Sequence, residues 1–494
     1  MMTNETTIGV VPHAVTTAPP LAEVHAAHRE RVRCHYNQAA SAQSSWRSRA
    51  WFYHRHIEHS YQSMILPGSS VLEIGSGGGS LLASVKPGRG VGVDLSESMI
   101  DFARQQHPHL EFICGDFEEV DFNETFDYII INGTLDEVDD IQMFLGKLQR
   151  VCSPTTRIIA DNHNPIWAPI LKLAETMGVK MPQPPQNWLP AYDLKNLFFV
   201  SGLDVIRTRY SLLLPFYVPL VSWLANRILA ALWPFHNLCL TRFMVARHPM
   251  PPAPGHVTCS VVITCRDERD NIEALIQRTA LLGNDTELIF SEGHSKDGTR
   301  TEIQRCMAKY QHRNIRLVVQ DGIGQGDAMR KGFGIATGDL ILWLEADLTT
   351  PPEEILKLYT VLSEGKGEFV NGSRLVYPMP KGSMRTLNLW GNRFFGHLFT
   401  WLLEQQFRDT LCGLKGLTRK GYEKIVAERN YFGAFDPFGD FELLFGSGRC
   451  NLKIVEVPVH YRPRSYGETK ISRFRDGLLL LRMSWLALWR LKLS

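Results

Sequence analysis

The sequence predicts an α/β protein that consists of two doubly wound domains. The chain has 494 residues, too many for one hydrophobic core, since domains usually span about 100 to 250 residues. Two separate series of short apolar strands alternate with helical patterns, which is typical of parallel sheets covered by helices on both faces. A proline cluster at 249–254 separates the two series.

The first series predicts a domain over 22–210, preceded by a flexible tail at 1–21. Residues 22–63 are rich in His, Arg, Trp and Tyr and predict one or two helices that cap this domain. Five apolar strands are expected, at 71–74, 90–93, 111–114, 128–132 and 157–160.

The second series predicts a domain over 257–472. Its expected strands are 259–264, 287–291, 315–319 and 340–344. Residues 211–256 are predicted to form an apolar segment and a Pro-rich linker. The apolar part is interrupted by Pro215, Pro219, Arg227 and Pro234, whereas a spanning helix needs about 20 apolar residues, so we expect an interfacial or packed segment.

Composition narrows the class of protein. The 53 basic residues nearly balance the 51 acidic ones, so there is no bulk attraction to nucleic acid, and no nucleic-acid partner is expected. The nine cysteines are scattered and never spaced as CxxC, which argues against a disulfide framework and a zinc site. The first thirty residues have no apolar core of signal-peptide length, so we expect a cytoplasmic protein.

The first chemical motif is a glycine-rich turn after the strand at 71–74. Glu73, Gly75, Gly77 and Gly79 form E-x-G-x-G-x-G, in which backbone approaches a ligand closely and a helix begins. Ser80 stands where a dinucleotide fingerprint requires glycine, and no Gly-Lys-Ser/Thr ending follows. The turn therefore fits neither phosphate-binding motif.

This motif resembles the first motif of class I S-adenosylmethionine-dependent methyltransferases, which have a Rossmann-like fold. The resemblance implies that Glu73 and the three glycines approach the donor, that Asp94 accepts from the ribose hydroxyls and that Asp116 lies near the adenine. It places Asn132 where methyl donor and substrate meet. Asn132, Asp136 and His163 are candidates for the methyl step, with loop capping or solvation as the alternative for each, because methyl transfer can run largely on positioning.

The second domain carries a pair of carboxylates at a strand end. Glu345 and Asp347 stand at i and i+2, where they can bind a hard divalent cation that bridges a diphosphate. Three further motifs precede the pair, at 260–271, 291–299 and 324–332.

In this order the motifs resemble those of family 2 glycosyltransferases, which have the GT-A fold and invert the anomeric carbon. The resemblance implies Mg²⁺ or Mn²⁺ at Glu345 and Asp347, the latter also catalytic, and a UDP- or GDP-sugar donor. Ser291, Gln325 and Glu345 depart from the family pattern, so the base stays open. The implied donor-binding residues are Thr264, Arg266, Glu268, Glu292, Asp297, Gln325 and Glu345.

The distal motifs at 371–374, 408–415, 438–444 and 455–470 resemble polyprenyl-phosphate sugar synthases such as dolichyl-phosphate mannose synthase. The resemblance implies that Arg374, Arg464 and Lys470 contact phosphates of the acceptor or donor. Asp440 is the candidate for acceptor activation.

Residues 473–494 predict a basic amphipathic helix, with Arg475, Arg482 and Arg490 along one face. Such a helix suits an anionic membrane surface; a core or dimer helix is the alternative.

Together these patterns favour a bifunctional transferase that glycosylates a polyprenyl phosphate or lipid-linked glycan and methylates the same product, at the inner face of the membrane. Two alternatives remain: a soluble tailoring enzyme that acts on a diffusible metabolite, and a methyltransferase fold that serves only as a binding module.

Overall fold

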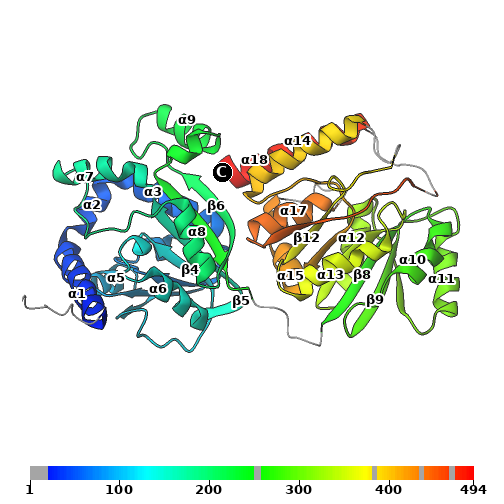
Figure 1. Cartoon of the computed structure of the whole chain (residues 1–494), viewed down its shortest axis with the longest axis horizontal. Helices are drawn as coiled ribbons and strands as arrows, with labels where there is room; N and C mark the ends of the chain where they lie inside the picture. Colours follow the sequence, from blue (N-terminus) through cyan, green and yellow to red (C-terminus); the bar gives the residue numbers. More distant parts are fainter. Residues whose placement is uncertain are drawn as a thin grey trace, which may run out of the picture.

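The computed structural model describes residues 21–249, 257–380, 386–432, 439–464, 466 and 473–493. Two seven-stranded sheets lie side by side, each flanked by helices, and the C-terminal end lies between the two domains (Figure 1). The predicted α/β class with two doubly wound domains is confirmed.

The first sheet has the strand order β3-β2-β1-β4-β5-β7-β6. The first five strands in that order are parallel, and β7 pairs antiparallel with both β5 and β6. The strands are β1 (Ser70–Ile74), β2 (Arg89–Asp94), β3 (Glu111–Cys114), β4 (Phe126–Asn132), β5 (Cys152–His163), β6 (Asp204–Ser211) and β7 (Thr241–Arg247).

Strand β4 explains the continuous apolar pattern of the central strands. Ile129 and Ile131 pack into one core, and Tyr128 and Ile130 pack into another on the opposite face of the sheet. Both faces of a parallel sheet are buried under helices, so neither set of alternating positions is polar.

The expected domain boundary at residue 210 is wrong, because it cuts the first sheet. Strand β6 runs to Ser211, and β7 lies inside the expected linker yet is buried along its length against β5. We therefore propose that the first domain extends to Arg247.

Three N-terminal helices cover the first domain, where one or two were expected. They are α1 (Leu21–Ala39), α2 (Gln43–Arg49) and α3 (Trp51–Met64). The remaining helices of this domain are α4 (Ser80–Ser84), α5 (Glu97–Gln106), α6 (Ile141–Lys147), α7 (Ala168–Thr176), α8 (Ala191–Val200) and α9 (Val221–Arg227).

The second sheet has the order β10-β9-β8-β11-β13-β12-β14, with β13 antiparallel to its neighbours. Its strands are β8 (Thr258–Cys265), β9 (Asp285–Glu292), β10 (Asn314–Val319), β11 (Leu340–Glu345), β12 (Phe369–Ser373), β13 (Lys415–Thr418) and β14 (Ile454–Pro458). Its helices are α10 (Ile272–Arg278), α11 (Thr299–Lys309), α12 (Gln325–Ile335), α13 (Ile355–Ser363), α14 (Thr386–Leu403), α15 (Arg419–Ala427), α16 (Arg429–Phe432), α17 (Asp440–Arg449) and α18 (Arg473–Leu488).

The C-terminal helix α18 has two apolar sides. Leu480, Met483 and Ala487 are buried in a core that also contains α14 side chains, while Leu481 and Trp485 are exposed. One side thus packs as a core helix, and the other remains open to a partner. Within the described part of the chain, no helix is long and apolar enough to cross a membrane.

Buried ion pairs join the two domains. Arg157 of β5 donates to both carboxylate oxygens of Glu368, at 2.6 and 2.7 Å. Glu404, just after α14, accepts from Arg209 Nε at 2.8 Å, and also from Arg207 and Lys492. Although burial alone would raise the pKa of Glu404, Arg209, Lys492 and Arg207 hold it well below its ordinary value.

Replacing this carboxylate is expected to destabilise the pair of domains. Glu404→Gln leaves three buried cations without their counter-charge and should lower the free energy of unfolding by about 3 to 5 kcal/mol. Because the folded-state pKa of Glu404 is depressed, the wild-type contribution is present at neutral pH and is lost only as the pH falls well into acid. Chemical denaturation measures the difference, with Glu353→Gln, in an exposed pair with Arg278, as the control expected to cost under about 1 kcal/mol. Equal losses of unfolding free energy in Glu404→Gln and Glu353→Gln would contradict the role of Glu404 as a buried counter-charge between the domains.

Candidate functional sites

The glycine turn after β1 has a backbone that only glycine adopts readily. Gly75, Gly77 and Gly79 have φ values of 73°, 48° and 73°. A Cβ on Gly75 would lie 2.3 Å from Thr134 Oγ1, which itself donates to the carbonyl oxygen of Ile74. The turn is therefore held against the loop that follows β4.

Two carboxylates, half-buried Asp94 and buried Glu73, fix this turn. Asp94, at the end of β2, accepts from the backbone N–H groups of Gly77 and Ser96, each at 2.8 Å. Burial raises the pKa of Asp94, and burial raises the pKa of Glu73 to about 8. Glu73 accepts from the backbone N–H of Leu82 in α4 at 2.9 Å, so in this structure it anchors the helix behind the turn.

Helices α1 and α2 lie over the turn. Arg29 of α1 donates to Asp116 at 2.8 Å. Gln43 of α2 lies so close to the turn that its Oε1 would be 2.7 Å from a Cβ on Gly78. Among the described residues Gln43 Oε1 is buried and accepts no hydrogen bond. An acceptor without a partner beside a carboxylate such as Asp94 fits a ligand that carries an amino group and ribose hydroxyls.

A hydrogen-bonded chain lies at the carboxyl ends of β4 and β5. Tyr53 Oη lies 3.1 Å from His163 Nε2, and His163 Nδ1 lies 3.2 Å from Asp136 Oδ2. Nearby, Tyr61 donates to Asp161 at 2.7 Å, and burial raises the pKa of Asp161 to about 7. A histidine between a carboxylate and a hydroxyl group is the arrangement that moves a proton. Asn132 lies beside this group, because it pairs with Asp161 in the register of β4 and β5.

At the end of β11, Glu345 and Asp347 lie together as the sequence spacing predicts. Glu345 accepts from the Gln325 amide, and burial together with the charge of Asp347 raises its pKa to about 7. A Cβ on Gly413 would lie 2.1 Å from the Glu345 carboxyl carbon, so glycine there leaves room for this longer side chain.

Arg464, in the segment after β14, contacts Asp347, one member of this carboxylate pair. It donates to Asp347 Oδ2 at 2.6 Å and lies 3.3 Å from Glu268 Oε1. The other oxygen of Asp347 accepts from the backbone and hydroxyl of Thr349. Arg464 thus pairs with Asp347, one of the two carboxylates that would also attract a cation.

Polar side chains at the ends of β8 and β9 mostly fix loops. Thr264 accepts from the Trp343 indole at 3.1 Å, and Glu292 accepts from Ser295 N at 2.5 Å. Asp297 accepts from Arg269 N and Thr299 N. The side chain of Arg266, in the same edge of the sheet, is 49% exposed and so is accessible to a ligand.

Arg374 and Asp440 are each engaged in a buried ion pair. Arg374 donates through two nitrogens to Asp409, at 2.8 and 2.9 Å, and Arg374 is the largest influence that lowers the pKa of Asp409, to about 2 against the effect of burial. Asp440, at the start of α17, pairs with Lys415, while burial raises its pKa. Lys470 lies outside the described residues, and its expected phosphate contact stays a prediction.

The donor set at β11 fits a divalent cation. Carboxylate oxygens are hard ligands of the kind that Mg²⁺ and Mn²⁺ prefer. A cation there would compete with Arg464 for Asp347, and both groups would favour a diphosphate nearby.

Comparison with known proteins agrees with this division of the chain. Residues 65–190 match the model of a methyltransferase domain, and residues 260–426 match that of glycosyl transferase family 2. The chain joins a methyltransferase domain to a family 2 glycosyltransferase domain. The resemblances drawn from the motifs are therefore confirmed.

The named relatives are glycosyltransferases or sugar transferases. The chain is 27% identical over 251 residues to glycosyltransferase AglD of Haloferax volcanii, covering 48% of this chain and 39% of that protein. It is 27% identical over 226 residues to an undecaprenyl-phosphate 4-deoxy-4-formamido-L-arabinose transferase of Enterobacter, covering 44% of this chain and 63% of that one. The chain thus spans less than two thirds of either relative. A solved glucosyl-3-phosphoglycerate synthase of Mycobacterium tuberculosis matches with a TM-score of 0.36 and 17% identity, over 48% of this chain and 81% of that one.

In the methyltransferase domain, Asp94→Asn is expected to weaken S-adenosylmethionine binding by roughly 30-fold, because a hydrogen bond to a charged group contributes about 1.5 to 3 kcal/mol. The substitution removes the charge that holds Gly77 and faces the expected ribose. Calorimetry measures the affinity, with the exposed Glu97→Gln as control. Unchanged affinity for Asp94→Asn would remove Asp94 from the donor site.

No local pattern in the sequence indicates the roles of Gln43 and Tyr53 or the contact of Arg464 with Asp347. Each of these residues lies far along the chain from its partner. The sequence around each one is equally compatible with a surface or packing residue.

Proposed function

We propose that the second domain transfers a sugar, with inversion, from a UDP- or GDP-sugar to a polyprenyl phosphate or lipid-linked glycan, and that the first domain methylates the same product from S-adenosylmethionine. The observation that carries this proposal is the pair Glu345 and Asp347 at the β11 end, with Arg464 bound to Asp347. The relative that acts on undecaprenyl phosphate supports the choice of acceptor class.

In sugar transfer, Glu345 and Asp347 would hold the divalent ion, which when bound neutralises the diphosphate that leaves. Glu292 would accept from the base or ribose, and Arg266 and Arg464 would contact phosphates. A phosphate oxygen of the acceptor is already anionic and needs no base, so Asp440 would act by holding buried Lys415, with which it pairs, rather than by removing a proton.

In methyl transfer, Asp94 and Gln43 would position the donor, which when bound supplies an electrophilic methyl group. His163, held by Asp136, would take the proton from an acceptor hydroxyl as the new O–C bond forms and the C–S bond breaks. In the structure the Tyr53 hydroxyl lies at His163 Nε2, the position that the acceptor hydroxyl would take in the reaction, or from which Tyr53 would pass on its proton. The chain Tyr53–His163–Asp136 thus favours a hydroxyl acceptor.

The test uses the purified full chain with Mn²⁺, a radiolabelled nucleotide sugar and undecaprenyl phosphate in detergent. The expected result is label that partitions into the lipid phase. Label found only on water-soluble products would favour the soluble tailoring enzyme. Methyl label from S-adenosylmethionine on the glycolipid is expected as well; donor binding without any methylated product would favour a binding module.

A further inference from the structure

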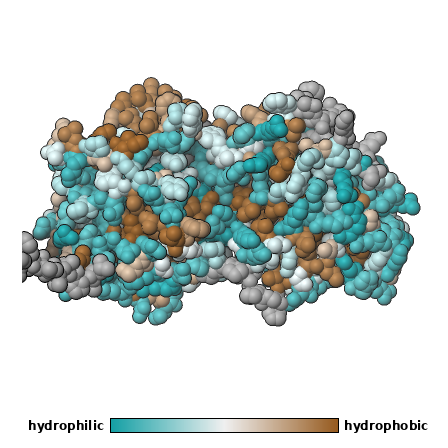
Figure 2. Space-filling view, in the orientation of Figure 1, coloured by the Kyte–Doolittle hydropathy of each residue, from teal (hydrophilic) through white to brown (hydrophobic). Residues whose placement is uncertain are grey.

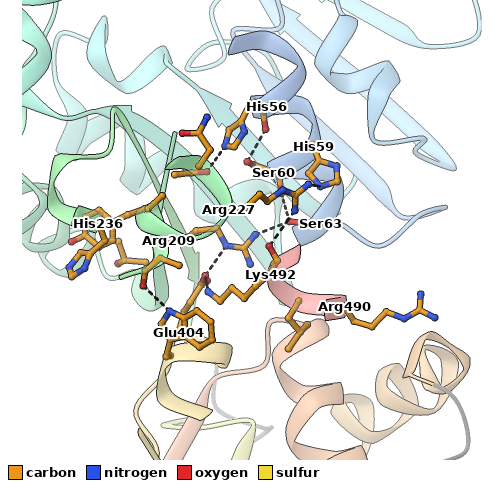
Figure 3. A pocket seen from close by; sticks show the side chains of 18 of the residues that line it. His56, His59, Ser60, Ser63, Arg209, Arg227, His236, Glu404, Arg490 and Lys492 are labelled. Carbon is orange, nitrogen blue, oxygen red and sulfur yellow. Dashed lines mark hydrogen bonds and ion pairs between the residues drawn. The ribbon is translucent and has the colours of Figure 1, made fainter. Parts of the chain in front are cut away.

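A pocket of about 270 Å³ lies between the two domains, apart from both candidate active sites (Figure 3). Its walls come from α3, β6, the segment between β6 and β7, the end of α14 and the C-terminal helical turn. None of the residues assigned above to methyl or sugar transfer lines it.

The pocket is basic. Among the described residues, Arg209, Arg227 and Lys492 line it together with the carboxylate of Glu404, which accepts from three cations, Arg207, Arg209 and Lys492. His56, His59 and His236 also line it. Burial, opposed by Glu404 and aided by Arg209, lowers the pKa of Lys492 to about 8.

One wall of this pocket has an apolar outer surface. Residues 216–238, which contain α9, supply Arg227 to the pocket and also expose a group of large apolar side chains, led by Leu220 at 84% and Trp233 at 79%. Figure 2 shows the resulting hydrophobic patch over α9 at the upper edge of the molecule. A contiguous apolar surface of this kind on a folded protein marks an interaction site.

Further exposed apolar groups lie along the same side. Helices α7, α9, α14 and α18 follow the upper side of the molecule in Figure 1. They expose Ile170 and Leu173, Trp223, Trp390 and Phe394, and Leu481 and Trp485, respectively. Tryptophan beside aliphatic side chains suits the boundary between headgroups and acyl chains.

The position of the basic pocket beside an apolar surface indicates binding to a lipid bilayer rather than to another protein. In a bilayer, phosphate groups lie just outside the acyl boundary, so a surface that inserts apolar side chains brings nearby cations to the depth of the phosphates. Here the basic pocket and the apolar patch share the segment 216–238.

We propose that the pocket between the two domains binds the phosphate headgroup of an anionic membrane lipid while the segment 216–238 lies in the bilayer interface. This docking site goes beyond sugar and methyl transfer. Its test measures membrane binding alone, so the docking site and the proposed transferase function can each be disproved separately.

Vesicle flotation of the full chain tests the pocket. With phosphatidylcholine vesicles that contain roughly one-fifth phosphatidic acid, the charge reversal Arg227→Glu is expected to weaken binding about 30-fold relative to the wild type. The matched control Arg300→Glu makes the same change of charge at an exposed residue outside the pocket and should change binding less than about threefold. Equal weakening by both variants, or by neither, would overturn the phosphate pocket.

A second pair of variants tests the apolar segment without touching the pocket. Leu220→Glu/Trp223→Glu alters only exposed side chains and is expected to abolish flotation with the same vesicles. Leu281→Glu, also exposed but before β9 in the second domain, should float like the wild type. Flotation of Leu220→Glu/Trp223→Glu at the wild-type level would overturn the docking surface, as would inorganic phosphate that binds the pocket in a wild-type chain that does not float.

Discussion

Asp347→Asn is expected to lower the rate of sugar transfer by roughly 1,000-fold, the scale on which losing one preorganised electrostatic partner of the transition state reduces catalysis. Asparagine keeps the shape of the side chain but removes the charge that faces Arg464 and the expected cation. Neighbouring Glu345 alone would then have to hold the ion. Initial rates of label transfer to lipid, measured at saturating donor and Mn²⁺, give the effect.

The matched control is Asp285→Asn, an exposed aspartate at the other end of the second sheet, which should leave the rate unchanged. S-adenosylmethionine binding by Asp347→Asn should equal that of the wild type, which separates loss of the metal site from misfolding. Sugar transfer within tenfold of the wild type would remove Asp347 from the catalytic site.

His163→Gln is expected to slow methyl transfer by roughly 100- to 10,000-fold, the contribution of a positioned general base. Glutamine preserves hydrogen bonding to Asp136 or Tyr53 but cannot accept the proton of an acceptor hydroxyl. Affinity for S-adenosylmethionine should not change, because Asp94, Gln43 and the glycine turn are intact. Single-turnover methylation of the glycolipid measures the rate.

The control for His163→Gln is His109→Gln. His109 is an exposed histidine after α5, so this variant should methylate at the wild-type rate. Sugar transfer by His163→Gln should also be normal. A methylation rate close to that of the wild type would show that positioning alone drives the methyl step and that the Tyr53–His163–Asp136 chain has a structural role.

The parallel strands could be predicted because their signals are local. Apolar runs bounded by glycine or acidic residues predicted β1 to β5 and β8 to β11, and the carboxylates at strand ends lie at one edge of each sheet as expected. Strands β6 and β7 could not be paired from the sequence, since the apolar segment between them gives no register. The expected boundary at residue 210 was wrong for this reason.

In the candidate sites, too, local sequence patterns predicted some features, whereas others depend on contacts between distant segments. The spacing of Glu345 and Asp347 predicted their proximity, and Asp94 lies against the glycine turn as the motif implies. The orientation of buried polar groups was not predictable: Glu73 faces Leu82 of α4, and Arg374 is bound by Asp409. Both depend on partners that only the three-dimensional packing brings near.

The two domains form one interlocked body, because buried pairs such as Arg157 with Glu368 and Arg207 with Glu404 cross between them. A fixed arrangement is consistent with the proposal that both domains act on one lipid-linked product.

The most direct test of that account is mass spectrometry of the lipid product formed by the purified chain from a nucleotide sugar, S-adenosylmethionine and undecaprenyl phosphate. The account predicts a glycolipid that carries both the sugar and one methyl group, with the methyl group alone missing for His163→Gln and the sugar missing for Asp347→Asn. A wild-type product without sugar for every UDP- and GDP-sugar supplied, or sugar transfer that persists in Asp347→Asn, would contradict it.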